Sequence, residues 1–165
     1  MKTREESILQ LLNKEIKKDD LVIASTGRIS RELFELRVKR KEPTTDFLML
    51  GSMGCAVGIG LGVALNTKKK VYVLTGDGAL LMKFGSIATV FKYKLKNLKI
   101  IVLNNYCHDS CGGQATAFEE IRNFIPCNIK IMNIKKGTRK NLGRPTITPI
   151  QNKKVFMEKI KNIVE

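Results

Sequence analysis

The chain has 165 residues, enough for one domain with its own hydrophobic core. Its 43% hydrophobic and 27% charged residues are ordinary for a globular protein, and its longest apolar stretch, residues 53–65, is too short and glycine-rich to span a bilayer. A membrane protein is therefore not expected. Acidic residues near the N-terminus argue against a signal peptide, so we expect a cytoplasmic protein.

The charge is strongly basic. Thirty Lys and Arg against fifteen Asp and Glu give a net charge of +15, and much of the surplus lies in residues 121–157, which contain no acidic side chain. No ladder of aromatic residues accompanies these charges, as is usual in proteins that bind single-stranded nucleic acid. The charge therefore favours an anionic cofactor, an anionic small-molecule substrate or a partner subunit over nucleic acid.

Apolar spacing predicts strands and helices that alternate along the chain. In chain order we expect a helix over 5–17, a strand over 21–24, a helix over 30–39, a strand over 47–50, a Gly- and Ala-rich helix ending at Asn66, a strand over 71–75, a helix over 79–93, strands over 98–103 and 129–134, and a helix over 153–164. This order predicts a single α/β domain over residues 1–165, a three-layer doubly wound parallel sheet with helices on both faces. Such sheets bind ligands beyond the carboxyl ends of their strands.

Two polar motifs follow consecutive strands of this sheet. Gly76-Asp77-Gly78 follows the strand over 71–75, and Asn104-Asn105 follows the next strand, with 25 residues between Gly78 and Asn104. One helix and one strand fit in that gap, so Asp77 and Asn105 should lie at the same edge of neighbouring strands. Oxygen ligands with a single carboxylate suit a Mg²⁺ ion that also holds phosphate. Gly78 permits close approach of the backbone, and the start of the next helix offers free N–H groups, so the motifs predict a Mg²⁺-diphosphate site.

This pair of motifs resembles the signature of the thiamine-diphosphate enzymes, which is Gly-Asp-Gly followed some 25 to 30 residues later by Asn or Asn-Asn. The resemblance implies that Asp77 and Asn105 bind Mg²⁺ and that the backbone carbonyl of Cys107 is the third protein ligand. It also implies that Gly78 and Ala79 bind the diphosphate through backbone N–H groups.

A second motif, Gly51-Ser52-Met53-Gly54, follows the strand over 47–50. In the same family a large apolar residue at the third position lies under the cofactor and forces its two rings into a V. The resemblance implies this role for Met53 and a hydrogen bond from the aminopyrimidine to the carbonyl of Gly51. The alternative is that Met53 is a methionine of the hydrophobic core.

The resemblance narrows to the phosphonopyruvate and sulfopyruvate decarboxylases in three further stretches, which are residues 25–36, residues 108–114 and residues 137–146. His108, the only histidine, could contact substrate or carry a proton, or it could simply pack. Cys111 stands where these decarboxylases usually have Thr, which leaves the role of position 111 open. Arg139 and Arg144 are candidates to bind a second anion of the substrate.

The family resemblance as a whole predicts a thiamine-diphosphate- and Mg²⁺-dependent carboxy-lyase that decarboxylates a 2-oxo acid. The best match is phosphonopyruvate, converted to phosphonoacetaldehyde. The alternatives are the beta subunit of a sulfopyruvate decarboxylase of coenzyme M synthesis or a subunit of another 2-oxo-acid enzyme of this cofactor. We expect Met53 and His108 to be catalytic, and the expected cofactor contacts are Gly27, Arg28, Gly51, Ser52, Met53, Gly76, Asp77, Gly78, Ala79 and Asn105.

Enzymes of this family also need a glutamate that bonds the aminopyrimidine, and it lies on a separate pyrimidine-binding domain. About 20 residues precede the first expected strand, so that domain is not expected within this chain. The resemblance therefore implies a partner alpha subunit that supplies the glutamate, in a hetero-oligomer with two or more copies of each chain.

Three other interpretations are less well supported. Cys107 and Cys111 do not have the spacing of a zinc site, so reduced, unpaired cysteines are expected. The glycines at positions 58, 60 and 62 do not match a dinucleotide-binding motif and instead favour close helix packing. A basic adaptor without catalysis would not need Asp77, Asn105 and the Gly51–Met53 turn intact.

Overall fold

A parallel sheet forms the centre of the computed structural model, which describes residues 1–137 and 139–161. Within these residues one sheet of five strands is found, in the order β2-β1-β3-β4-β5. The strands are β1 (Leu21–Ala24), β2 (Phe47–Leu48), β3 (Val71–Gly76), β4 (Leu98–Asn104) and β5 (Lys130–Asn133). The central strands are apolar at nearly every position because side chains on both of their faces are buried.

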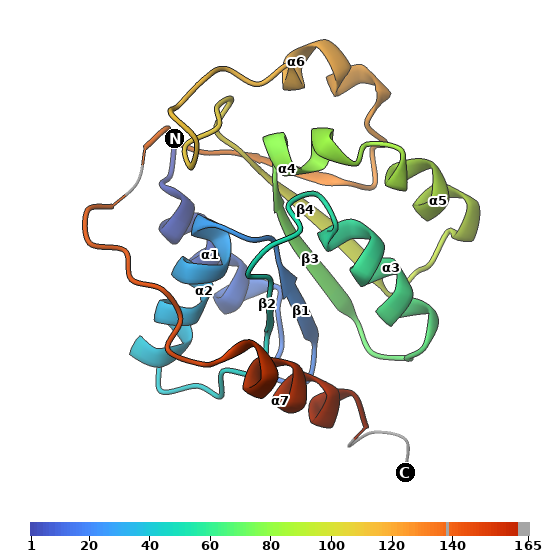
Figure 1. The fold of residues 1–165 in the computed structure, drawn as a ribbon. Helices are drawn as coiled ribbons and strands as arrows, with labels where there is room; N and C mark the ends of the chain where they lie inside the picture. Colours follow the sequence, from blue (N-terminus) through green and yellow to red (C-terminus); the bar gives the residue numbers. More distant parts are fainter. Residues whose placement is uncertain (138, 162–165) are drawn as a thin grey trace.

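Helices cover both faces of the sheet, which gives the three layers that the sequence predicts (Figure 1). On one face lie α1 (Arg4–Lys14) and α2 (Arg28–Lys39), whose apolar side chains pack on alternate residues of the strands. The second core, on the opposite face, includes side chains from α3 (Ala56–Leu65), α4 (Asp77–Met82), α5 (Ser86–Tyr93), α6 (Phe118–Ile121) and α7 (Pro149–Lys161). A short 3₁₀ helix, η1 (Arg122–Phe124), follows α6.

The strand order places a switch point beside β1. The chain runs from β1 to β2 on one side and then crosses to β3 on the other side of β1. Loops that leave β1 and β3 therefore diverge at their carboxyl ends and leave a crevice between them, which is where doubly wound sheets bind ligands. The fold confirms the predicted doubly wound α/β class. A ligand site is therefore expected beside the residues just after Ala24 and Gly76.

The close approach of α3 to the sheet depends on Gly60. A β-carbon at Gly60 would lie 2.2 Å from Cγ2 of Val73, in the middle of β3. Any side chain there would push the helix off the strand. The prediction that the glycines of this helix serve close packing is therefore confirmed at Gly60 only, because Gly58 and Gly62 are exposed and a β-carbon at either would meet nothing within 4 Å.

The prediction of one continuous helix over residues 79–93 is wrong. The structure divides this region into α4 and α5, with Lys83–Gly85 between them. At the break the N–H groups of Lys83 and Phe84 bond three residues back, and the N–H and hydroxyl of Ser86 both donate to the carbonyl of Lys83. Gly85 lowers helix stability, and Ser86 offers the backbone this alternative partner.

Other boundaries differ by less. The strand predicted over 47–50 ends at Leu48, and α6 and η1 were not predicted. The last helix begins at Pro149 rather than at Lys153, with the side chain of Thr148 accepting from the backbone N–H of Gln151. Proline is favourable in a first helical turn because its missing N–H has no intrahelical partner there. The predicted end of this helix, at Val164, lies outside the described residues, as does Thr138.

Candidate functional site

Asp77 and Asn105 lie at neighbouring strand ends, as the sequence predicts. β3 and β4 pair in parallel with Gly76 opposite Leu103, so Asp77 leaves β3 at the level where β4 ends. Asp77 is 2% exposed and Asn105 is 5% exposed. Two buried oxygen-bearing side chains therefore face the same crevice at the carboxyl edge of the sheet.

Each of these two side chains is fixed at one terminal atom. The hydroxyl of Thr116 donates to Oδ2 of Asp77 at 2.6 Å, and Nδ2 of Asn105 donates to Oδ2 of Asp109 at 2.6 Å. In the part of the chain that the structure describes, no hydrogen bond reaches Oδ1 of Asp77 or Oδ1 of Asn105. One oxygen of each side chain is thus left for a ligand.

The loop over residues 106–116 holds these contacts in place. The N–H of His108 donates to the carbonyl of Gln114 at 2.8 Å, and the N–H of Thr116 donates to the carbonyl of Tyr106 at 3.1 Å. Cys107, whose carbonyl was predicted as a metal ligand, lies between these bonds opposite Ala115. The loop therefore closes on itself and returns Thr116 to Asp77.

Asp109 is the most connected side chain of this loop. Its carboxylate accepts from Nη2 of Arg4 at 2.7 Å, from Nδ2 of Asn105, from the thiol of Cys107 at 3.1 Å and from the N–H of Gly137 at 3.4 Å. Burial raises the pKa of Asp109, but the bonds from Cys107 and Arg4 outweigh it, so the net pKa is lowered. Burial, with the bond to Asp109, raises the pKa of the Cys107 thiol to about 11.

A cavity of about 70 Å³ lies among these residues. Its lining contains most of the predicted site residues, namely Arg28, Met53, Gly76, Asp77, Gly78, Ala79, Asn105, Cys107 and His108. The structure does not bring Gly27, Gly51 and Ser52 into this lining, and the last two lie on an exposed turn. The cavity has room for a few water molecules but not for a whole cofactor.

Two polar side chains of this lining have atoms without a partner. The hydroxyl of Ser25, a residue only 1% exposed, and Nε of Arg28 are buried without a hydrogen bond in the described structure. Nη2 of Arg28 has only a long bond, 3.5 Å, to the carbonyl of Asp109. Buried polar groups are normally satisfied, so two unsatisfied donors beside one cavity fit an anionic ligand that accepts from them.

The predicted wedge residue also faces the cavity. Met53 lines it and is partly exposed, whereas a core methionine would be buried. The adjoining Gly54 packs on the first turns after β3, since a β-carbon there would lie 3.1 Å from the carbonyl of Ala79. This contact sets the turn that carries Met53 against the start of α4.

Arg139 and Arg144, predicted to bind substrate, do not line the cavity. Arg139 forms an ion pair with Glu35 on α2 and lies 3.7 Å from Glu5 on α1, while Arg144 is exposed. The arginines of the lining are Arg28 and Arg4, and no sequence motif predicts Arg4 at the site. Arg4 and Thr116 were missed as site residues because their partners are distant in sequence, and Asp109 was missed because no motif relates it to Asn105.

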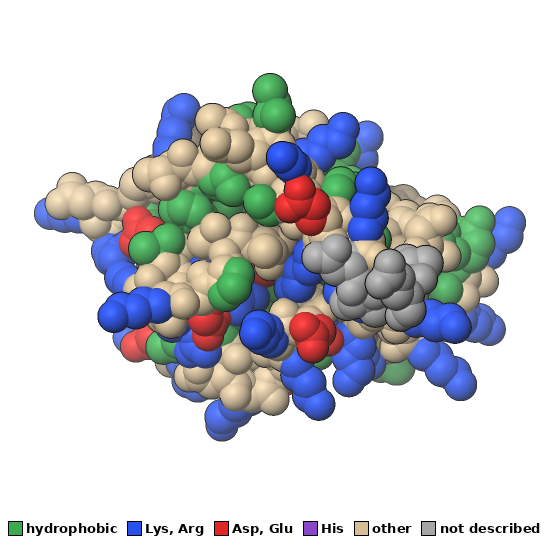
Figure 2. Space-filling model, turned by 90° about the horizontal axis from the view of Figure 1, so that it is seen from below, with side chains coloured by type: hydrophobic (Ala, Val, Ile, Leu, Met, Phe, Trp, Pro, Cys, Tyr) green, Lys and Arg blue, Asp and Glu red, His purple; other side chains and the backbone are tan. Residues whose placement is uncertain are grey.

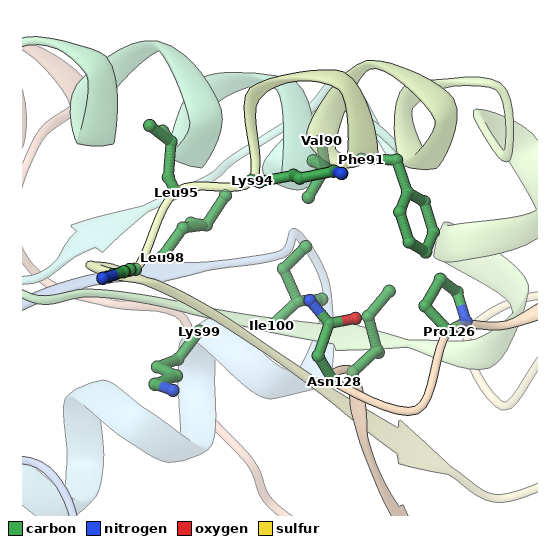
Figure 3. A pocket seen from close by; sticks show the side chains of 11 residues that line it. Val90, Phe91, Lys94, Leu95, Leu98, Lys99, Ile100, Pro126 and Asn128 are labelled. Carbon is green, nitrogen blue, oxygen red and sulfur yellow. The ribbon is translucent and has the colours of Figure 1, made fainter.

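Two larger hollows lie away from this site. One of about 390 Å³ lies beside α5 and the start of β4, where the ring of Phe91 faces Pro126 (Figure 3). The other, of about 690 Å³, is lined by residues of α1, α2 and α7. Neither contains a predicted site residue, since both lie near the amino ends of the strands or over the outer helices.

The face of the molecule seen in Figure 2 carries its positive charge diffusely. Seen from below, Lys and Arg side chains are spread around the whole face rather than gathered in one stripe (Figure 2). Among the described residues all four cysteines are free, and no cluster of three or more His, Cys, Asp or Glu could hold a metal ion. None of the described helices combines the length and apolar character needed to cross a bilayer.

Comparison with known proteins gives a consistent result. The model of the family described as "Thiamine pyrophosphate enzyme, C-terminal TPP binding domain" matches residues 25–163. The chain is 45% identical over 108 residues to a phosphonopyruvate decarboxylase of Streptomyces viridochromogenes, which covers 66% of the chain but 26% of that protein.

Sulfopyruvate decarboxylase beta subunits match as well. The chain is 44% identical over 98 residues to that of Methanothermobacter thermautotrophicus, covering 59% of the chain and 51% of the relative. It is 32% identical over 155 residues to that of Methanocaldococcus jannaschii, covering 94% of the chain and 74% of the relative. The chain thus spans about a quarter of the phosphonopyruvate decarboxylase and between half and three quarters of these beta subunits.

Proposed function

The chain belongs to the thiamine pyrophosphate enzymes through their C-terminal TPP-binding domain, and on this premise we propose that it holds thiamine diphosphate and Mg²⁺ in a non-oxidative 2-oxo-acid decarboxylase. One observation carries the proposal: Asp77 and Asn105 are buried together at the ends of β3 and β4, each with one oxygen free of hydrogen bonds in the described structure.

The residues of the site fit the metal and the diphosphate. A carboxylate oxygen of Asp77, the amide oxygen of Asn105 and the carbonyl of Cys107 form the oxygen-only set with one charge that suits Mg²⁺ shared with a phosphate. The backbone at Gly78 and Ala79 carries no large side chain, which allows a diphosphate to approach its N–H groups. The unsatisfied hydroxyl of Ser25 and Nε of Arg28 give further donors for the anion.

Other residues shape the reactive end of the cofactor. Bound thiamine diphosphate supplies the electron-accepting thiazolium that decarboxylation of a 2-oxo acid requires. Met53 lies at the cavity rim, where its side chain is proposed to support the bent conformer, and the carbonyl of Gly51 is proposed to accept from the aminopyrimidine. His108, in the loop beside the metal ligands, is the candidate to contact substrate or carry a proton.

The proposed substrate is phosphonopyruvate, with sulfopyruvate as the alternative. Relatives of both names support a substrate that carries a second anion beside its carboxylate. Within the site, Arg28 is the arginine with an unsatisfied donor, so it is the candidate to bind a tetrahedral oxyanion of substrate or cofactor.

We further propose a partner subunit that carries a pyrimidine-binding domain and the activating glutamate, in a cytoplasmic hetero-oligomer. The name of the beta subunits among the relatives supports a second kind of subunit. The exposure of Gly51 and Ser52 supports it too, because these residues are expected to contact the cofactor and would then be covered by a second chain.

Calorimetric titration of the chain, assembled with a pyrimidine-domain subunit, with thiamine diphosphate and Mg²⁺ tests the cofactor assignment. Asp77→Asn removes the one carboxylate of the ligand set at nearly unchanged shape, so metal-dependent binding should weaken by about 100-fold or more. Asn105→Ala should weaken it less. Arg139→Met, away from the cavity, is the matched control and should bind as the wild type does. Equal affinity of the Asp77 variant and the wild type would refute the assignment.

The assembly is tested separately. The purified chain alone should be folded but inactive, and co-expression with a pyrimidine-domain subunit should give phosphonopyruvate or sulfopyruvate decarboxylation. Turnover by the chain alone at the rate of the assembled enzyme would contradict the proposed partner subunit. It would not contradict the proposed cofactor site.

A further inference from the structure

Asp109 lies behind the proposed metal ligands rather than among them. Its side chain is 12% exposed, and its oxygen Oδ2 accepts from both Arg4 and Asn105. Asn105 is one of the two side chains on which the metal site depends. The hydrogen bond that Asp109 accepts from Asn105 therefore sets the orientation of the Asn105 amide.

The amide of Asn105 has two unlike ends. Only the Nδ2 end donates hydrogen bonds, and only the Oδ1 end can bind a cation. An ionised carboxylate accepts but does not donate, so Asp109 fixes Nδ2 against itself, at 2.6 Å, and turns Oδ1 away. In the opposite orientation the amide oxygen would face a carboxylate oxygen, and Nδ2 would face the metal.

Asp109 is itself held by α1. Arg4, which is 6% exposed, donates from Nη2 to Asp109 at 2.7 Å and from Nη1 to Glu32 on α2 at 3.3 Å. The two carboxylates share one buried guanidinium, whose planar fork fixes the direction of both bonds. Arg4 also lies outside residues 25–163, which match the family model.

We propose that Asp109 is a positioning residue that presents the amide oxygen of Asn105 to Mg²⁺, and that Arg4 holds Asp109 in place for this purpose. The inference rests on the proposed function, because it assigns Asn105 to the metal. Groups that orient metal ligands from behind typically change metal affinity by about 10- to 100-fold when they are removed.

Electron paramagnetic resonance of Mn²⁺, with the full chain assembled with a pyrimidine-domain subunit and saturating thiamine diphosphate, measures this affinity without turnover. Asp109→Leu removes the acceptor at similar size and should raise the Kd for Mn²⁺ by about 10- to 100-fold. Arg4→Met should do the same, and Arg4→Lys, which keeps one charged donor, should recover part of the affinity.

Asp46→Asn is the matched control. Asp46 is 2% exposed and pairs with Arg37 at 2.8 and 3.1 Å, just before β2 and at the opposite end of the sheet. This variant should lower the melting temperature without changing the Kd for Mn²⁺.

The outcomes separate the two proposals. If Asp109→Leu and Arg4→Lys melt at lower temperature but bind Mn²⁺ within twofold of the wild type, the residues are only structural and the inference is overturned. If the wild type itself binds no Mn²⁺ in the presence of thiamine diphosphate, the proposed function fails first. Should Arg4→Met not fold, Asp109→Leu and Arg4→Lys still decide the matter.

Discussion

The imidazole of His108 lies directly against the α-carbon of Gly78. A β-carbon on Gly78 would come within 2.6 Å of both Cε1 and Nδ1 of that ring, well inside normal contact distance. The only histidine of the chain therefore covers the backbone that is proposed to bind diphosphate.

Gly78→Ala should for this reason abolish diphosphate binding. The added methyl group meets His108, so the ring or the start of α4 must shift, and this moves the backbone N–H groups that are proposed to bind diphosphate. Calorimetry with thiamine diphosphate and Mg²⁺ checks this against the double variant Gly78→Ala/His108→Ala. Affinity should recover in the double variant, because the clash with the ring is removed, and wild-type affinity in the Gly78 single variant would contradict the prediction.

Met53→Ala should lower turnover more than it lowers cofactor affinity. Met53 is at the cavity rim, so its loss leaves the metal and diphosphate contacts intact while the support for the bent cofactor is removed. Steady-state kinetics of the assembled enzyme are compared with cofactor titrations and thermal melts. A large drop in melting temperature with normal turnover would instead indicate a core methionine, whose truncation costs about 2–5 kcal/mol.

Arg28→Met should reduce the preference for a substrate with a second anion. If a tetrahedral oxyanion binds Arg28, the ratio of kcat/KM for phosphonopyruvate, or for sulfopyruvate, over pyruvate should fall by about 100-fold, which corresponds to ~3 kcal/mol for a charge-assisted bond. Arg139→Met should leave this ratio unchanged, because Arg139 pairs with Glu35 outside the cavity. If this kcat/KM ratio fell only in the Arg139 variant, Arg139 and not Arg28 would be the residue that binds the second anion.

Arg37→Met should be strongly destabilising. Arg37 bonds Asp46 with two nitrogens and Glu42 with a third contact, and it is 8% exposed. Removing the cation leaves the buried carboxylate of Asp46 without its partner, at a cost of about 3–5 kcal/mol in the free energy of unfolding. Urea denaturation measures this, with Arg139→Met as the exposed counterpart, which is expected to cost far less because water screens an ion pair at the surface. Similar losses in the two variants would contradict the prediction.

The four cysteines should react in a set order with a thiol reagent. Cys111 and Cys127 are exposed, whereas Cys107 is 6% exposed and its pKa is raised to about 11. At pH 8 almost all of the Cys107 thiol is therefore protonated and unreactive, because the thiolate is the nucleophile. Alkylation followed by mass spectrometry should modify positions 111 and 127 first and position 107 last. Early modification of Cys107 in the folded chain would show that the 106–116 loop opens.

Hydrophobic periodicity was sufficient to predict the class of fold. Buried strands such as Val71–Gly76 and Leu98–Asn104 are continuous apolar runs, a pattern that depends only on both sheet faces being covered. Because parallel strands end at one edge of a sheet, the same pattern predicts that Asp77 lies next to Asn105. Chain order thus determined where the chemistry lies.

Periodicity did not predict local breaks or partners in space. The helix after Gly76 is divided where Ser86 donates two hydrogen bonds to the carbonyl of Lys83. The free-energy difference between this arrangement and a continuous helix is small, so periodicity does not predict it. The sequence made Arg139 a candidate for substrate binding. In the structure Arg139 instead forms an ion pair with Glu35 of α2.

The sequence by itself determined the parallel sheet, its carboxyl edge and the two metal-ligand candidates, since these follow from side-chain spacing along single elements. Only the tertiary structure decided that Arg4 meets Asp109, which is 105 positions away, and that Thr116 returns to Asp77. The physical reason is that these bonds form between side chains that no shared helix or strand relates. Their geometry is set by how α1 packs on α2 and by how the 106–116 loop closes, and neither leaves a periodic trace in the sequence.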